Sequence, residues 1–301
     1  MRRGFAIVLP VMLLVFITGN ISCQSSRPAS GDEPFQFNLQ KGETYTYRMQ
    51  WEYDTKMNEN ESKTNMTADY LLKVTAEDDS IETVEITYKR VQLKVSAMGA
   101  EVMVDTDTPF IDSVPDFMDI TKMMTKMITA LKDKSFSMKI NREGKIVKVD
   151  GFDVITKEMM KAAQVPDGPG GPLTTIAKPP INEENMKEQL ERVLFIFPVR
   201  KIKNGDTWVK ESQLKDNGTV KIKTNYIVTH IEDNLVTLKM KTSIEGPVTS
   251  TSSKGTVSGT LVVDSNTGLV VNAELEDSAE TTNGSITVIR KGKGKITGKE
   301  N

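Results

Sequence analysis

The stretch Thr44-Tyr-Thr-Tyr-Arg-Met-Gln-Trp-Glu-Tyr53 alternates large apolar side chains with polar ones. Successive side chains of a β-strand point to opposite faces, so this alternation places the apolar residues on one face. Residues 66–76 repeat the pattern, with an apolar residue at every even position. One buried face and one solvated face are typical of strands in an antiparallel sheet. The sequence therefore predicts such a sheet.

The stretch 81–97 keeps this alternation but changes its phase once. Apolar residues occupy even positions up to Tyr88 and odd positions from Val91 onward, with the change at Lys89-Arg90. An extra residue in one strand is a β-bulge, which bends the strand and increases its twist. We expect a bulge here and a sharply bent sheet.

Residues 116–131, 152–163 and 183–195 carry apolar side chains at helical spacing instead. The third stretch begins with clear signals, because Asn182 can cap a helix and the two glutamates after it suit the positive helix end. Between the second and third stretches, the Pro/Gly-rich residues 166–172 fit neither a helix nor a strand.

Three short motifs recur in the same order in both halves of the chain. The paired segments are Lys41–Tyr45 with Asn204–Trp208, Tyr70–Val74 with Tyr226–His230, and Met138–Ile146 with Leu261–Leu269. Such order indicates an internal duplication, although short alternating strands also resemble one another by chance. The predicted fold class is α+β and β-dominated, with a curved antiparallel sheet or sheets from two similar halves and about three inserted helices.

The N-terminal sequence has the pattern of an export signal. Arg2 and Arg3 precede an apolar run at residues 6–17, which is shorter than the ~20 residues that a membrane-spanning helix needs. Small Ser22 then precedes Cys23, the only cysteine in the chain. This arrangement resembles the cleavage site of bacterial lipoproteins, which implies that Cys23 becomes the lipidated first residue. An ordinary cleaved secretory signal is the alternative.

The predicted organisation follows from these features. It comprises a signal peptide (1–22), a lipidated N-terminus with a flexible tether (23–35), an N-terminal β-rich half with two helices (36–165), a Pro/Gly linker (166–182), and a C-terminal helix with a second β-rich half (183–298). We expect the protein in the cell envelope, anchored through its N-terminal lipid to a membrane, at the outer membrane or the periplasmic face.

The charge balance argues against a nucleic-acid partner. Removal of Arg2 and Arg3 leaves 37 of the 39 basic residues against 41 acidic ones, a net charge of −4. A nucleic-acid binder would show a basic face or stripe. The one basic run, Lys291-Gly-Lys-Gly-Lys295, is interpreted as an exposed final strand whose lysines protect its edge.

Catalytic signatures are nearly absent from the sequence. The only histidine, His230, is in phase with Tyr226 and Val228 and is expected to point inward. It could act as a general base, but a single histidine without a cysteine partner does not provide the usual zinc ligand set. We therefore predict no enzymatic activity, no metal site and no cofactor.

The methionine content is a functional signal, but it is less specific than a catalytic motif would be. The chain has 16 methionines, and ten of them lie between Met98 and Met186. Flexible, polarizable side chains suit surfaces that adapt to varied apolar partners. The candidate ligand-facing residues are Met123, Met124, Met127 and Met159. The alternative is an ordinary core with methionine as filler.

The segments Phe37–Tyr45 and Gly205–Trp208 resemble those of uncharacterised bacterial lipoproteins in a domain-of-unknown-function family. A curved antiparallel sheet with inserted helices is also similar, at the level of fold, to carriers of the lipoprotein-localisation type. The absence of catalytic signatures and the methionines on the predicted helices favour a membrane-anchored, non-enzymatic binding or scaffold module, with an apolar or lipid-like ligand as one candidate. The alternatives are a structural protein that binds another envelope protein and, third, a hydrolase.

Replacing Cys23 with serine tests the anchor. If Cys23 carries the lipid, Cys23→Ser expressed in a bacterial host should leave the membrane fraction and keep its fold, because stable anchoring depends on the acyl chains. Fractionation with immunodetection measures the first effect, and circular dichroism the second. Equal membrane association of the two proteins would contradict the assignment.

Overall fold

The computed structural model describes residues 36–78, 80–108, 119–163, 183–194, 196–198, 200–214, 220–246 and 251–301. The predicted signal peptide, Cys23 with its tether, and the linker at 166–182 lie outside these residues.

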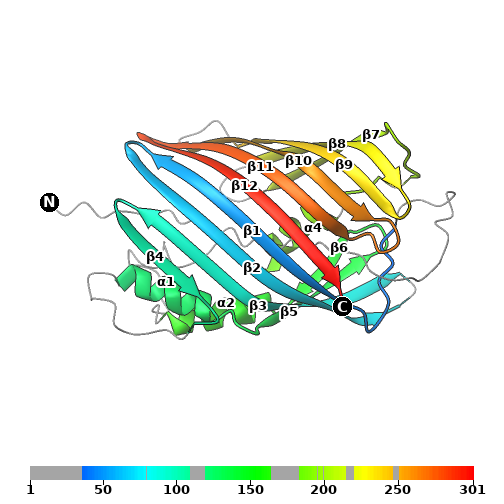
Figure 1. Ribbon diagram of the computed structural model, residues 1–301, viewed down its shortest axis with the longest axis horizontal. Coiled ribbons are helices and arrows are strands. Elements are labelled where there is room, and N and C mark those ends of the chain that lie inside the picture. Colours follow the sequence, from blue (N-terminus) through cyan, green and yellow to red (C-terminus); the bar gives the residue numbers. More distant parts are fainter. Residues whose placement is uncertain are drawn as a thin grey trace.

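A single 12-stranded antiparallel sheet dominates the described chain and curves strongly (Figure 1). The prediction of a β-dominated antiparallel fold is confirmed. The strand order is β6-β5-β3-β2-β1-β12-β11-β10-β9-β8-β7, and β4 pairs with β3. The strands are β1 (Thr44–Met57), β2 (Asn60–Glu77), β3 (Ile81–Ala97), β4 (Ala100–Asp105), β5 (Ser135–Asn141), β6 (Ile146–Asp150), β7 (Thr207–Leu214), β8 (Val220–Glu232), β9 (Leu235–Glu245), β10 (Thr251–Asp264), β11 (Val270–Asn283) and β12 (Ile286–Glu300).

The first and last strands of the chain pair with each other in the middle of this sheet. β12 is bonded to β1 on one side and to β11 on the other. The interpretation of Lys291–Lys295 as an edge strand is therefore wrong. The three lysines of this run are exposed on the outer face, and the two glycines between them are buried on the inner face. The alternation of lysine and glycine thus gives this central strand one solvated face and one buried face.

Two glycines of β12 let aromatic rings lie flat on the sheet. Trp51 faces Gly294 across the strand pair, and Tyr53 faces Gly292. A Cβ atom added to Gly294 would lie 2.6 Å from the Trp51 ring, and one on Gly292 would lie 2.5 Å from the Tyr53 ring. The two rings are stacked with their centroids 5.4 Å apart and an interplanar angle of 1°. Glycine is thus required where the rings cover the strand.

The helices lie near β4, β5 and β6, at one end of the strand order (Figure 1). Helix α1 (Asp119–Thr129) contacts β4, α2 (Phe152–Ala162) contacts β5, and α4 (Glu183–Leu194) contacts β6. After α4 the chain reaches β7, where the Trp208 indole N–H donates to the carbonyl of Ile196 at 2.7 Å. No helix in the described ranges is long and apolar enough to cross a bilayer.

The sheet contains several bulges, and those in β3 and β8 bear on the sequence predictions. The register between β2 and β3 shifts between Asp69 and Tyr70, leaving Lys89 as the extra residue, so the predicted bulge is confirmed. In β8 a second shift falls between Val228 and His230. The prediction that His230 points inward is wrong, because this bulge turns its side chain outward, where it is 60% exposed.

The two arms of the sheet, which we define as β1–β6 and β7–β12, share local details. The N–H of Gly42 donates to the carbonyl of Val74, and the N–H of Gly205 donates to the carbonyl of Val228, both at 2.9 Å. Each valine is followed by a bulged threonine, whose hydroxyl donates to a carbonyl of the next strand at 3.1–3.2 Å. These details are local, and the duplication of whole halves stays a prediction.

Gly294→Ala tests the ring-over-glycine contact. The added methyl group would collide with the Trp51 ring, so we expect a loss of about 1–3 kcal/mol in the free energy of unfolding, measured by chemical denaturation. Lys293→Ala, one residue away on the exposed face, is the matched control and should change it by less than about 0.5 kcal/mol. Equal effects of the two substitutions would show that the contact contributes little.

Candidate functional site

The inner face of the sheet is apolar along its middle rows. One row crosses five strands with buried apolar side chains only: Met49, Ile296, Ala273, Leu261 and Leu238. These residues belong to one continuous hydrophobic core. This part of the face offers only apolar surface.

Toward the hairpin between β1 and β2 the inner face becomes polar. The hydroxyls of Thr224 and Thr242, both buried, lie 2.9 Å apart, and those of Ser253 and Thr281 lie 3.2 Å apart. Cross-strand hydroxyl pairs satisfy each other and stabilise the sheet. The inner face as a whole is therefore amphipathic along the strand direction.

An ion pair lies at the boundary between the two zones. Arg290 donates from Nη2 at 2.8 Å and from Nε at 3.2 Å, and both bonds reach the same oxygen, Oδ2 of Asp277. The guanidinium also lies 4.9 Å above the centre of the Tyr53 ring. A cation over an aromatic face is favourable, most of all where water is excluded. The pair is thus held from two sides.

Two buried polar atoms at this boundary have no hydrogen-bond partner among the described residues. They are Oδ1 of Asp277 and Nε1 of Trp51, on side chains that are 6% and 4% exposed. Trp208, the other tryptophan, has its N–H bonded to Ile196. Buried polar groups are nearly always bonded, so each exception needs an explanation.

Tyr53 is unsuited to act as a base here. Burial raises the pKa of its phenol well above the ordinary value, the charge of Asp277 raises it further, and Arg290 opposes the rise. The hydroxyl therefore keeps its proton at neutral pH. The arrangement favours binding through hydrogen bonds and ring contacts.

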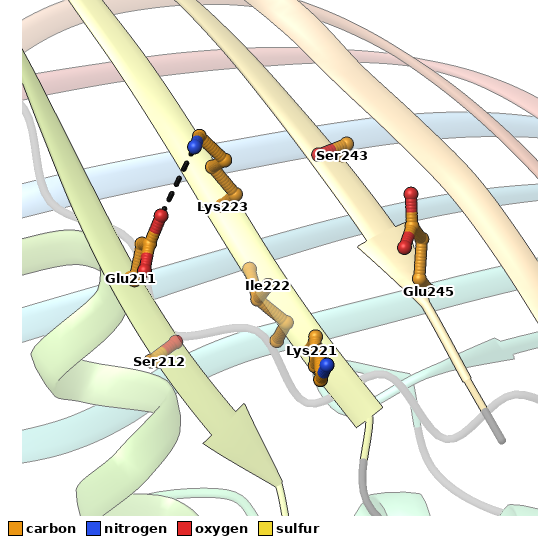
Figure 2. Close-up of a pocket in the computed structure, with 7 residues that line it drawn as sticks. All are labelled: Glu211, Ser212, Lys221, Ile222, Lys223, Ser243 and Glu245. Carbon is orange, nitrogen blue, oxygen red and sulfur yellow. Dashed lines mark ion pairs between the residues drawn. The ribbon is translucent and has the colours of Figure 1, made fainter.

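The outer face carries two shallow hollows. Figure 2 shows one of about 440 Å³ between β7, β8 and β9, with Lys223 and Glu211 pointing toward each other from neighbouring strands at 3.0 Å. A second, of about 830 Å³, lies near the β1–β2 and β3–β4 hairpins. Exposed ion pairs of this kind contribute little energy. Both hollows are lined mainly by short polar and long charged side chains.

The candidate methionines occupy the helix side of the core. Met123, Met127 and Met159 are buried members of the hydrophobic core, and Met124 is partly buried. None of the four lines either outer hollow. Their role as ligand contacts stays a prediction.

The remaining polar side chains that could bind a metal do not form a cluster among the described residues. His230 lies on the outer face, 3.2 Å from Glu232. Within the ranges that the structure describes, no three His, Cys, Asp or Glu side chains come together as a metal site would require. Sequence analysis missed Asp277 and Arg290, and the signal that could have found them is two opposite charges in phase with inward-facing apolar residues.

Glu82 is a buried carboxyl at the opposite end of the inner face. It is 3% exposed, and its Oε2 has no hydrogen-bond partner among the described residues. Burial is the main cause that raises its pKa to about 7; Glu77 adds to the rise, while Arg142 and backbone hydrogen bonds, including one from Leu39, oppose it. Its ionisation therefore falls near neutral pH.

Comparison with known proteins places the chain in a family. The model of DUF6263, described as a family of unknown function, matches residues 79–270. The predicted domain-of-unknown-function family is thus confirmed, while lipoprotein status and likeness to localisation carriers stay predictions. No curated protein matches the sequence.

The solved structures found are distant. An outer membrane channel from Pseudomonas putida F1 has 9% identity, with 91% of this chain and 100% of the channel covered and a TM-score of 0.28. The translocator domain of the autotransporter NalP from Neisseria meningitidis has 6% identity, with 86% and 89% covered and a TM-score of 0.23. These scores are too low for any argument to rest on them.

Glu82→Gln should make stability less dependent on pH. The folded carboxyl keeps its proton up to a pH of about 7, whereas the unfolded one loses it near 4.5. The folded state therefore binds more protons in this window, and the free energy of unfolding falls as pH rises through it.

Chemical denaturation at pH 5 and pH 8 measures the effect on the soluble chain that starts at Gln24. The variant should be more stable than the wild type at pH 8, by on the order of 2 kcal/mol, and nearly equal to it at pH 5. Glu85→Gln, an exposed carboxyl on the other face of β3, is the control. A difference that is the same at both pH values would contradict the assignment.

Proposed function

The chain belongs to DUF6263, a family of unknown function, and we propose that it is a lipid-anchored protein of the cell envelope that binds an apolar, lipid-like ligand without transforming it. The observation that carries the proposal is the change along the inner face of the sheet. Apolar rows around Ile296 give way, within a few residues of the same strands, to the Arg290–Asp277 pair and the hydroxyl pairs. Predominantly apolar walls with a few convergent polar groups are typical of ligand sites.

The predicted anchor fits this role. The described chain starts at Gln36, and the next residue, Phe37, is buried against Gly144 and Gly268 in the turns after β5 and β10. A tether from Cys23 to this point has 13 residues and spans at most about 45 Å when extended. The sheet would thus stay within reach of the lipids of its own membrane.

The helices supply the other wall in this proposal. Met123 and Met127 on α1 and Met159 on α2 are buried, and Met124 on α1 is partly buried. Unbranched thioether side chains can shift to admit chains of different shape. We place the ligand between these helices and the inner face of the sheet.

The repeated hydrogen bonds at Gly42 and Gly205 support a further part of the proposal, that the sheet arose from two similar halves. In this reading the strands β1–β3 correspond to β7–β9, and the hairpin β5–β6 corresponds to β10–β11. Matching bulges before Ile140 and Val263 fit the same correspondence.

Two measurements test ligand binding. The soluble chain, purified from a bacterial periplasm, should carry lipid that mass spectrometry of an organic extract detects, and it should take up an apolar fluorophore. Met124→Glu should weaken uptake while the protein still melts cooperatively, because it places a charge at the edge of the ligand space. Val154→Glu adds the same charge at an exposed position of α2 and is the control.

A chain that neither carries lipid nor takes up the fluorophore would overturn the proposal, and binding of another envelope protein would become the better hypothesis. Loss of cooperative melting in Met124→Glu would instead indicate a filled core at that position.

A further inference from the structure

We infer that the ligand is an amphiphile with an uncharged head that bears more than one hydroxyl, and that Trp51 and Asp277 bind this head. The inference rests on the proposed function. It starts from the two buried polar atoms, Nε1 of Trp51 and Oδ1 of Asp277, that have no hydrogen-bond partner among the described residues.

Both atoms belong to side chains on the inner face, on either side of β12. Trp51 on β1 covers Gly294, and Asp277 on β11 faces Gly292, where its Oδ1 would lie 2.2 Å from an added Cβ atom. The two glycines are separated by one residue, so their positions along the strand differ by about 7 Å. The two atoms therefore flank the short length of β12 that the Trp51 and Tyr53 rings cover.

The chemistry of the two atoms fixes what a ligand must offer. An indole N–H only donates, so it needs an acceptor on the ligand. The free carboxylate oxygen of Asp277 only accepts, because Arg290 directs both of its bonds to the other oxygen, so it needs a donor. A hydroxyl can do either. One group for each of the two atoms gives a head with at least two hydroxyls, as in a glycerol-type head.

Other heads fit this site less well. A pure hydrocarbon would leave both atoms unbonded, and each buried unsatisfied group costs about 1–3 kcal/mol. An anionic head would bring its charge toward the unpartnered oxygen of Asp277, and like charges in a buried site repel strongly. The apolar row through Met49 and Ile296, next along the strands, suits an attached acyl chain.

Three oleoyl compounds that share one chain test the head group. Affinities are measured by displacement of an apolar fluorophore with 1-monooleoylglycerol, methyl oleate and oleate. We expect 1-monooleoylglycerol to bind at least about tenfold more tightly than methyl oleate, which lacks free hydroxyls. Oleate should bind more weakly than 1-monooleoylglycerol.

Two tryptophan variants locate the effect. Trp51→Phe keeps a ring over Gly294 but removes the N–H, so the preference for 1-monooleoylglycerol over methyl oleate should shrink several-fold. Trp208→Phe removes an N–H that already bonds Ile196, and the preference should stay unchanged. Asp277→Asn, checked for cooperative melting, should bind oleate more tightly than the wild type does.

The outcomes separate the two proposals. If no oleoyl compound binds, the proposed function itself fails. If 1-monooleoylglycerol and methyl oleate bind the wild type equally, ligand binding stands, the head-group inference is overturned, and buried water is the better partner for the two atoms. A preference that survives Trp51→Phe undiminished would overturn the role of Trp51.

Discussion

The contact between the aromatic rings of β1 and the glycines of β12 is the constraint on which the rest of the molecule depends. Trp51 and Tyr53 can lie flat on the neighbouring strand only because Gly294 and Gly292 have no side chains. This contact lies at the junction of the two arms of the sheet. A side chain at either glycine would displace the ring that covers it, where β1 and β12 pair.

The same contact explains why the run Lys291–Lys295 of β12 is charged on its outer face and has no side chains on its inner face. Alternation in β12 sends every lysine of the run outward and both glycines inward, so one short sequence solubilises the outer face and makes room on the inner one. The Arg290–Asp277 pair is one exception, because it places charged side chains on the inner face. It is held by the Tyr53 ring and by two hydrogen bonds to one carboxylate oxygen.

Much of the fold could be predicted from the sequence, because period two is a local property. The stretches around Tyr47, Tyr70 and Tyr88 are strands with the predicted faces buried, and the phase change at Lys89 marks a real bulge. The partners of a strand are not local. Nothing in residues 286–300 says that they pair with residues 45–57, so an apparent edge strand lies at the centre of the sheet.

The candidate site was harder to predict for the same reason. Methionine stripes are visible along the chain, and three of the four candidates lie in the core. The β11–β12 register places Asp277 opposite Gly292 and Arg290 opposite Ala279, so the two charges meet only diagonally across these strands. Trp51 joins them only through β12. His230 shows the opposite failure, because a single bulged residue reversed the face that its spacing indicated.

The central position of β12 also bears on how the protein is made. One edge of β1, the first strand along the described chain, has no partner until β12 is available. Pairing between such distant segments is slow, because the loop-closure entropy must be overcome before the contacts form. The pairing at the centre of the sheet therefore forms only after β12 has been synthesised, whereas β1, β2 and β3 can pair with one another earlier.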